Sequence, residues 1–424
     1  MKRALALSVA DQALLSAFGF GLNLYLIRAW PPEQFGFFAV LAAAGVFAAM
    51  LQNALVNTPL AVHLPVAPGS AERALLRRAF GSANLLLTLL VLVLAWALVA
   101  LSLGGGQALL AAVAALHAAA QFQREYYRSR LAVEAQMRAL LLADAAYLLL
   151  ACGALGAIEY AELPVQQALP VLLGALAGAA LLSVAPHWRP LRPAAWPALP
   201  RELRQVFGAQ MHEIRWSLAG VITTDMQNRG YIFVAAAVFG PAAVAHLQAG
   251  RLFFGPLNLL SGAWARVARP RLARCAGQGE QAAFAALLRQ AALLFVALNA
   301  AFLGALWLAW PLLAEHVFGD KYRHMGGLVA AWGLANLLFQ LRSCLATGVQ
   351  ALRRFRDLTM ATLYGALLSA LLLAAVCAAV WEQGLIASVI AGECVALVVV
   401  VAILRQHADA RAPAAAPAGA LAQP

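Results

Sequence analysis

The sequence has very few charged residues for its length. Of its 424 residues, 11% are charged and 63% are hydrophobic, and the mean hydropathy is +0.78. Lysine is nearly missing, since Lys2 and Lys321 are the only two. A soluble chain of this length needs more charge to cover its surface. The composition therefore excludes a soluble globular protein and predicts an all-α polytopic membrane protein.

Several chemical signatures are also missing. The five cysteines form no C-x-x-C pair, and the sequence has no P-loop, no nucleophile elbow and no metal-binding cluster. We therefore expect no metal, no cofactor, no enzymatic activity and no direct use of ATP. The net charge is +12, but the basic residues lie in short runs between apolar stretches. That pattern is typical of the loops of a membrane protein, so we expect no nucleic-acid partner.

What the sequence has in abundance is long apolar segments. A membrane span needs about 20 apolar residues to cross a hydrocarbon core of about 30 Å. By this measure the chain holds twelve predicted helices, which are 8–29, 36–62, 79–102, 107–124, 139–158, 165–186, 209–236, 242–264, 284–312, 326–348, 358–380 and 384–404.

A proline- and arginine-rich segment, 187–208, divides these helices into two halves of six. The predicted architecture is therefore an N-terminal lobe over 1–186, a cytoplasmic linker over 187–208 and a C-terminal lobe over 209–405. We expect the two six-helix lobes to surround a central cavity, as in transporters built from repeats. The Ala/Pro-rich residues of 406–424 predict a disordered cytoplasmic tail.

Loop charges predict the orientation of the chain. Loops on the same side as the N-terminus hold nearly all of the loop arginines, Arg124 and Arg128 among them, whereas the opposite loops hold Arg28, Lys321 and Arg323 as their only basic residues. Basic loops stay in the cytoplasm. We therefore expect a multi-pass membrane protein with both termini in the cytoplasm.

The predicted seventh helix carries charges that a lipid-facing helix could not carry. In the segment 212–233, Arg215, Asp225 and Arg229 fall on one helical face at 100° per residue. Charge within a bilayer is costly, so this face is expected to line a water-filled cavity or to meet a partner. Asp225 and Arg229 are also spaced i, i+4, and they could instead neutralise each other.

Three more arginines lie inside predicted spans, and one of them, Arg289, is close enough to a cytoplasmic end to extend its side chain to the membrane surface. By the helical rise, Arg251 lies roughly 14 Å and Arg229 roughly 12 Å from the outer ends of adjacent antiparallel helices. Arg342, like Arg215, lies nearer the cytoplasmic side. One acid, Asp225, cannot neutralise four arginines, so we expect a cationic cavity. Arginine binds phosphate with a bidentate fork, which makes a phosphate-bearing substrate the natural ligand.

Other polar residues in the predicted spans allow two interpretations. Single Asn, Gln and Ser residues either line the cavity or hydrogen-bond neighbouring helices. Asp11 and Asp144 lie near cytoplasmic ends, where an ion pair and a proton relay are both plausible, and Glu393 is open in the same way. The candidates for the polar lining of the cavity are Gln12, Ser16, Asn23, Asn228 and His246.

Several stretches resemble the polysaccharide flippase family of the MOP exporter superfamily, which includes O-antigen and exopolysaccharide flippases. They are DQALLS at 11–16, PPEQFGFF at 31–38, RGYIFVAAAVFGPAAVAHLQAGRLFFGPLNLL at 229–260, RVARPRL at 266–272 and VFGDKY at 317–322. The resemblance runs from about residue 5 to 405. Flippases of peptidoglycan precursors resemble the chain too, but they carry two extra C-terminal spans.

The resemblance implies a function. A family member flips an undecaprenyl-diphosphate-linked oligosaccharide across the inner membrane by alternating access. By position, Arg215, Arg229 and Arg251 match the basic cavity residues of the family, with Arg342 less closely placed. The resemblance also implies that transport is coupled to H⁺ or Na⁺ through an acid within the membrane. Asp225 is the first candidate for this acid and Asp11 the second. Implied partners are the lipid-linked oligosaccharide, membrane lipids and polysaccharide-assembly proteins such as a polymerase, and the chain is expected to act as a monomer.

Two rival functions remain open on sequence grounds. A drug/cation antiporter of the same superfamily would favour embedded carboxylates over the four embedded arginines found here. A polytopic enzyme of surface-polysaccharide assembly would need catalytic acids or a large domain on its outer loops. The longest predicted outer loop, about 313–325, is too short for a domain.

Overall fold

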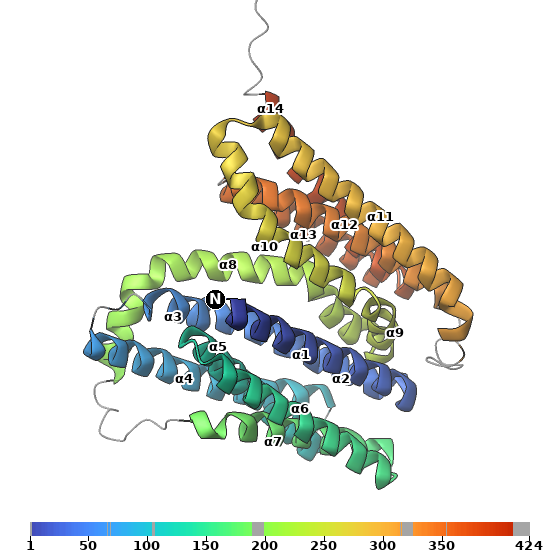
Figure 1. Ribbon diagram of the computed structural model, residues 1–424. Coiled ribbons are helices and arrows are strands. Elements are labelled where there is room, and N and C mark those ends of the chain that lie inside the picture. The colour runs from blue at the N-terminus through green and yellow to red at the C-terminus, as the bar shows by residue number, and fades with distance from the viewer. Residues whose placement is uncertain are drawn as a thin grey trace, which may run out of the picture. The chain divides into compact units, whose positions relative to one another are not determined.

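The computed structural model describes residues 2–65, 67, 69–103, 107–188, 199–313, 315, 325–352 and 354–409 (Figure 1). Throughout these ranges the chain forms helices and short connections, and they contain no strand. By internal packing it divides into two compact units. One is Met1–Asp225 with Gly240–Ala245, and the other is Met226–Phe239 with His246–Pro424. The predicted fold class, an all-α polytopic membrane protein, is confirmed.

The first unit is a bundle of long helices, drawn in blue to green in Figure 1. Its elements are α1 (Lys2–Ala29), α2 (Pro32–Gln52), a π-helical turn (Asn53–Asn57), α3 (Thr58–His63), α4 (Ser70–Leu103), α5 (Ala108–Val133), α6 (Met137–Tyr160) and α7 (Val165–Val184), with a 3₁₀ turn (Ala185–His187). The long helix α8 (Leu199–Phe239) follows, and the boundary between the two units falls within it.

The second unit continues from the last turns of α8. Its further elements are α9 (Pro241–Leu252), whose first residues belong to the first unit, then α10 (Gly255–Gln278), α11 (Gln281–Leu313), α12 (Gly326–Ala351), α13 (Phe355–Ala378), a 3₁₀ turn (Glu382–Gly384) and α14 (Leu385–Asp409).

The predicted linker and tail differ from the structure in extent. The middle of the predicted linker, 189–198, lies outside the described residues, and its last ten residues, 199–208, are already helical because α8 begins at Leu199. The cytoplasmic tail was predicted from 406, whereas α14 continues to Asp409, and 410–424 lie outside the described residues. The division into two six-helix lobes around a cavity stays a prediction.

The predicted spans agree with the helices except at the eighth, 242–264. This prediction was wrong because two helices, α9 and α10, occupy the segment. The break follows from Gly255 and Pro256, since a proline has no amide hydrogen and its ring clashes with the carbonyl four residues earlier. The amide of Phe254 instead donates to the carbonyl of Arg251 at 3.1 Å, which closes a tight turn.

Eight helical segments among the described residues are long and apolar enough to cross a membrane. They run from α2 through α3, and over α4, α6, α7, α11, α12, α13 and α14. The other predicted spans, in α1, α5, α8 and α9–α10, are not among these eight segments. These are also the helices in which most candidate site residues lie.

Each unit is built around one central helix. In the first unit α5 packs against α2, α4, α6 and α7, and in the second α12 packs against α10, α11, α13 and α14. Glycines let neighbours approach α12 closely, because a Cβ atom at Gly348 would lie 2.8 Å from the side chain of Leu288. A helix surrounded by protein has little contact with lipid, so it can carry polar residues whose partners lie on its neighbours.

Candidate functional site

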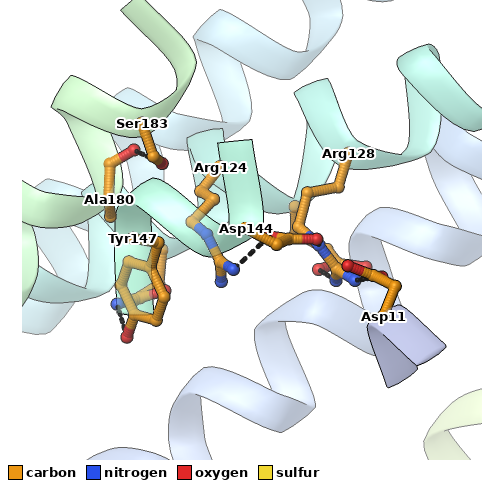
Figure 2. Close-up of polar contacts among 9 residues, drawn as sticks. Asp11, Arg124, Arg128, Asp144, Tyr147, Ala180 and Ser183 are labelled. Carbon is orange, nitrogen blue, oxygen red and sulfur yellow. Dashed lines mark hydrogen bonds and ion pairs between the residues drawn. The ribbon is translucent and has the colours of Figure 1, made fainter. Parts of the chain in front are cut away.

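A buried ion network lies among α1, α5 and α6 in the first unit (Figure 2). Arg124 and Arg128 extend from α5 toward Asp144 of α6, whose side chain is fully buried. Both arginines bind its carboxylate, with Arg128 Nε 2.9 Å from Oδ2. Arg128 also contacts Asp11 of α1 at 3.3 Å and Glu125 at 2.8 Å. The network therefore joins three helices with ion pairs that neutralise both arginines.

The Tyr147 side chain extends this network along α6. The guanidinium carbon of Arg124 lies 3.8 Å from the centre of the Tyr147 ring, which is the geometry of a cation–π contact. The Tyr147 hydroxyl accepts a hydrogen bond from Gln121 at 3.1 Å. Arg124 is thus held by an acid on one side and by an aromatic face on the other, an arrangement that fixes its position.

The sequence argument misplaced Arg124 and Arg128. It counted them among the arginines of loops on the N-terminal side, but α5 continues to Val133 and keeps both within the bundle. Their depth could have been found from the sequence, because Asp11, Asp144 and these arginines all lie toward the same ends of their predicted helices. Of the two interpretations given for Asp11 and Asp144, the ion pair is the one observed.

Neutral hydrogen bonds link α2, α4 and α5. Gln52 donates its amide to Asn84 Oδ1 and to the carbonyl of Phe122, both at 2.7 Å, and Asn84 donates to Gln123 Oε1 at 2.6 Å. All three amide side chains are buried. For Gln52 and Gln123 the interpretation as bonds between helices is therefore confirmed.

Three residues of the predicted polar lining, Gln12, Ser16 and Asn23, lie on α1. Gln12 is exposed and Ser16 is partly exposed. Asn23 donates to the carbonyl of Gly19 in its own helix at 2.7 Å, so its amide hydrogen serves the local backbone. Their role as cavity residues stays a prediction.

In the second unit Arg342 has an acidic partner. From α12 it donates two hydrogen bonds to Glu393 of α14, from Nε at 2.6 Å and from Nη2 at 3.1 Å. Gln227 of α8 adds a longer hydrogen bond to Glu393 at 3.4 Å. The sequence argument set one acid, Asp225, against four arginines and left the role of Glu393 undecided. Because Glu393 neutralises Arg342, three of those four arginines remain for the proposed cationic cavity.

Arg251 is held differently. It lies at the end of α9, half-buried, and its Nη1 donates to the Tyr231 hydroxyl at 3.1 Å and toward the carbonyl of Asn228 at 3.5 Å. Its guanidinium carbon lies 5.6 Å from the centre of the Trp332 ring. Each of these partners is neutral, so no acid among the described residues balances this charge. The contacts also place Arg251 beside the Asn228–Tyr231 level of α8, as the antiparallel depth estimate predicted.

The remaining candidates lie on α8 and α9. Arg215 is exposed, Arg229 and Asn228 are half-buried, and Asp225 is fully buried. His246 contacts Glu382 at 3.4 Å through a partly exposed pair. The cationic cavity that would bring Arg215, Arg229 and Arg251 together stays a prediction.

No protein-family model matches the chain, and no curated protein sequence matches it. Its fold, in contrast, matches solved membrane transporters. The lipid II flippase MurJ in an inward closed conformation gives a TM-score of 0.67 at 11% identity, over 95% of this chain and 87% of that chain. The protein shares the fold of this flippase.

Multidrug transporters share this fold. An inward-facing MATE family transporter of the MOP superfamily gives a TM-score of 0.61 at 15% identity, over 93% of this chain and 94% of that one. A MATE structure in the bent conformation gives 0.53 at 13% identity, over 96% and 94%. The described fold is therefore common to a lipid flippase and to multidrug transporters, and identities this low carry the fold alone.

Proposed function

We propose that this protein is a transporter that flips an undecaprenyl-diphosphate-linked oligosaccharide across the bacterial inner membrane by alternating access. The observation that carries the proposal is Arg251, a half-buried guanidinium whose described partners are all neutral. A charge held within a membrane protein without an acid is available to a ligand of opposite charge. A diphosphate fits because its oxygens match the forked donors of arginine.

The fold supports a lipid-linked substrate. MurJ is described as a lipid II flippase, and this chain matches most of its length. In the proposal Arg215 and Arg229 join Arg251 as substrate-binding residues, with Gln12, Ser16, Asn23, Asn228 and His246 lining the cavity. Arg342, given its bond to Glu393, has a smaller share in binding and instead holds α12 against α14.

The proposed energy source is an ion gradient. Asp225 on α8 is the first candidate for coupling to H⁺ or Na⁺ because its carboxylate is fully buried in a predicted span. Asp11 is second, although Arg128 and the rest of the ion network already bind it. Both termini are proposed to lie in the cytoplasm, with the protein acting as a monomer beside a polymerase and other assembly proteins.

A matched pair of variants tests the proposal. Arg251→Ala should stop export and leave lipid-linked oligosaccharide on the cytoplasmic leaflet, because the neutral site no longer attracts the diphosphate. The control is Arg289→Ala, which removes an exposed arginine from α11 of the same unit. The measurements are surface glycan, leaflet location of the lipid-linked oligosaccharide and protein level in the membrane. Normal surface glycan in cells carrying Arg251→Ala would refute the assignment.

A second candidate, a drug/cation antiporter, is favoured by the likeness to MATE transporters, which nearly equals the likeness to the flippase. Under this alternative a buried carboxylate such as Asp225 would bind the cation, and Arg251 would be dispensable. Efflux of ethidium from cells that express the protein separates the two functions. Efflux that survives Arg251→Ala and is lost in Asp225→Asn would favour the antiporter.

A further inference from the structure

The indole N–H of Trp332 is buried without a partner. Trp332 lies on α12 with 5% of its surface exposed, and its Nε1 makes no hydrogen bond to any described residue. A buried donor that lacks an acceptor is unfavourable, so most buried tryptophans find one. An acceptor oxygen from a bound ligand would satisfy this donor.

The position of this N–H is set by a glycine of α9. A Cβ atom built on Gly250 would lie 2.8 Å from Trp332 Cδ1 and 3.4 Å from Nε1. The N–H edge of the indole therefore packs on the α9 backbone, one residue before Arg251. On another side the Tyr231 ring lies 5.7 Å from the Trp332 ring, centre to centre. The indole N–H thus lies beside the arginine that carries the proposed function.

Arg251 also has N–H groups that make no hydrogen bond to the described residues. A guanidinium has five N–H donors. In the described structure its Nη1 alone has acceptors, the Tyr231 hydroxyl and the Asn228 carbonyl. Together with the Trp332 N–H, this corner of the second unit presents several unused donors and no described acid. Such a surplus of donors matches a group that only accepts hydrogen bonds, which is the character of a phosphate.

We propose that Trp332 is a substrate-binding residue that donates its Nε1–H to a phosphate oxygen of the lipid diphosphate bound by Arg251. Tyr231 holds the guanidinium in place from α8, and Gly250 leaves room for the indole edge. This inference rests on the proposed function and adds a neutral donor to it. A neutral N–H donor selects ligands by geometry, because it binds well only when the ligand places an acceptor oxygen along the N–H axis.

The test measures binding of farnesyl diphosphate, a soluble polyprenyl diphosphate, to the purified full-length protein. Trp332→Phe keeps an aromatic ring and removes the N–H, and it should weaken binding about tenfold, as expected for loss of one hydrogen bond to a charged group. Trp264→Phe is the matched control, since Trp264 packs edge-on against Phe295 in the same unit. Farnesol and inorganic pyrophosphate are the comparison ligands.

Two further measurements separate binding from packing. Replacing Trp332 by its sulfur analogue, benzothienylalanine, keeps the shape of the ring while removing the N–H, so it should reproduce the tenfold loss even if Trp332→Phe fails to fold. In the wild type, the indole N–H resonance that disappears in Trp332→Phe should shift when farnesyl diphosphate is added and stay in place with farnesol. A purely structural tryptophan would give neither result.

The outcomes distinguish this inference from the proposed function. Unchanged affinity in the sulfur analogue, with binding lost in Arg251→Ala, would overturn the role of Trp332 and leave the proposed function in place. Failure of the wild type to bind farnesyl diphosphate would overturn both. Pyrophosphate that binds as tightly as farnesyl diphosphate, with the same dependence on Trp332, would show a site for a free anion and overturn the lipid-linked ligand.

Discussion

The two central helices, α5 and α12, differ in how the buried arginines on and beside them are neutralised. Each is the fourth predicted span of its half, and each carries a row of polar side chains into its unit. On α5 both arginines meet acids from α1 and α6, so the charges close into a network. On α12 Arg342 has one acid, Glu393, and nearby Arg251 has neutral partners.

This difference separates two uses of arginine in a membrane protein. An arginine paired with a buried acid joins helices, and removing the acid leaves a charge without compensation. An arginine with neutral partners contributes less to folding and keeps its charge for a ligand. The comparison therefore predicts large losses of stability in the first case and small ones in the second.

The largest effect is expected at Asp144. Asp144→Asn leaves Arg124 and Arg128 without their shared acid in a buried site. Loss of one partner of a buried pair destabilises by about 3–5 kcal/mol. Thermal unfolding of the purified protein in detergent measures the loss, with Glu125→Gln as the control because Glu125 is one-third exposed. Equal stability of the two variants would show that the network does not hold α1, α5 and α6 together.

A somewhat smaller loss is expected at Glu393, since this carboxylate serves one arginine. Glu393→Gln should destabilise by about 3 kcal/mol because Arg342 stays buried without its counter-charge. Replacing both residues, with Arg342→Met and Glu393→Leu, should restore much of the stability, since apolar pairs can replace buried ion pairs. If the double variant folds well but transports nothing, Arg342 has a role in binding after all.

At Arg251 stability should change little. Arg251→Met removes a charge whose described partners are neutral and keeps an apolar side chain in its place. The midpoint of thermal unfolding should move by an amount corresponding to about 1 kcal/mol or less, while transport is lost. A loss of stability as large as that of Asp144→Asn would end the distinction between the two classes of arginine.

The smallest effect is expected at a surface pair of the first unit. Arg78 of α4 bonds Glu202 of α8 at 2.8 Å, and about half of the arginine side chain is exposed. Glu202→Gln should cost a few tenths of a kcal/mol, and the difference should vanish at high salt because exposed pairs are screened. A salt-independent loss above about 1 kcal/mol would show that burial alone does not rank these ion pairs.

The sequence predicts the helices well because span length and hydropathy are local properties. Every predicted span but one follows a continuous helical segment, and the one error, at 242–264, comes from Gly255 and Pro256 within an otherwise apolar segment. A glycine–proline pair is a known helix breaker, but the prediction rested on the length of the apolar segment and therefore ran one helix through the pair.

The partners of the buried charges could not be predicted in the same way. Arg128 meets Asp11 across 117 residues, and Arg342 meets Glu393 across 51. Hydropathy gives the depth of a residue and says nothing of the direction it faces. From its depth alone, Asp11 could form an ion pair or take part in a proton relay, and the ion pair was at least as well supported. The choice required knowing that α1, α5 and α6 pack together.

The π-helical turn Asn53–Asn57 has a consequence for how this chain tolerates changes in length. Gln52, Val56, Leu60 and Leu64 are all buried although they are spaced by four, a spacing that drifts by about 40° per step around a regular helix. The extra residue of the π turn cancels part of that drift. Deleting one residue from this turn would restore a regular helix while both flanks keep their facing. The segment can therefore absorb a one-residue deletion that would rotate half of an ordinary membrane helix out of register.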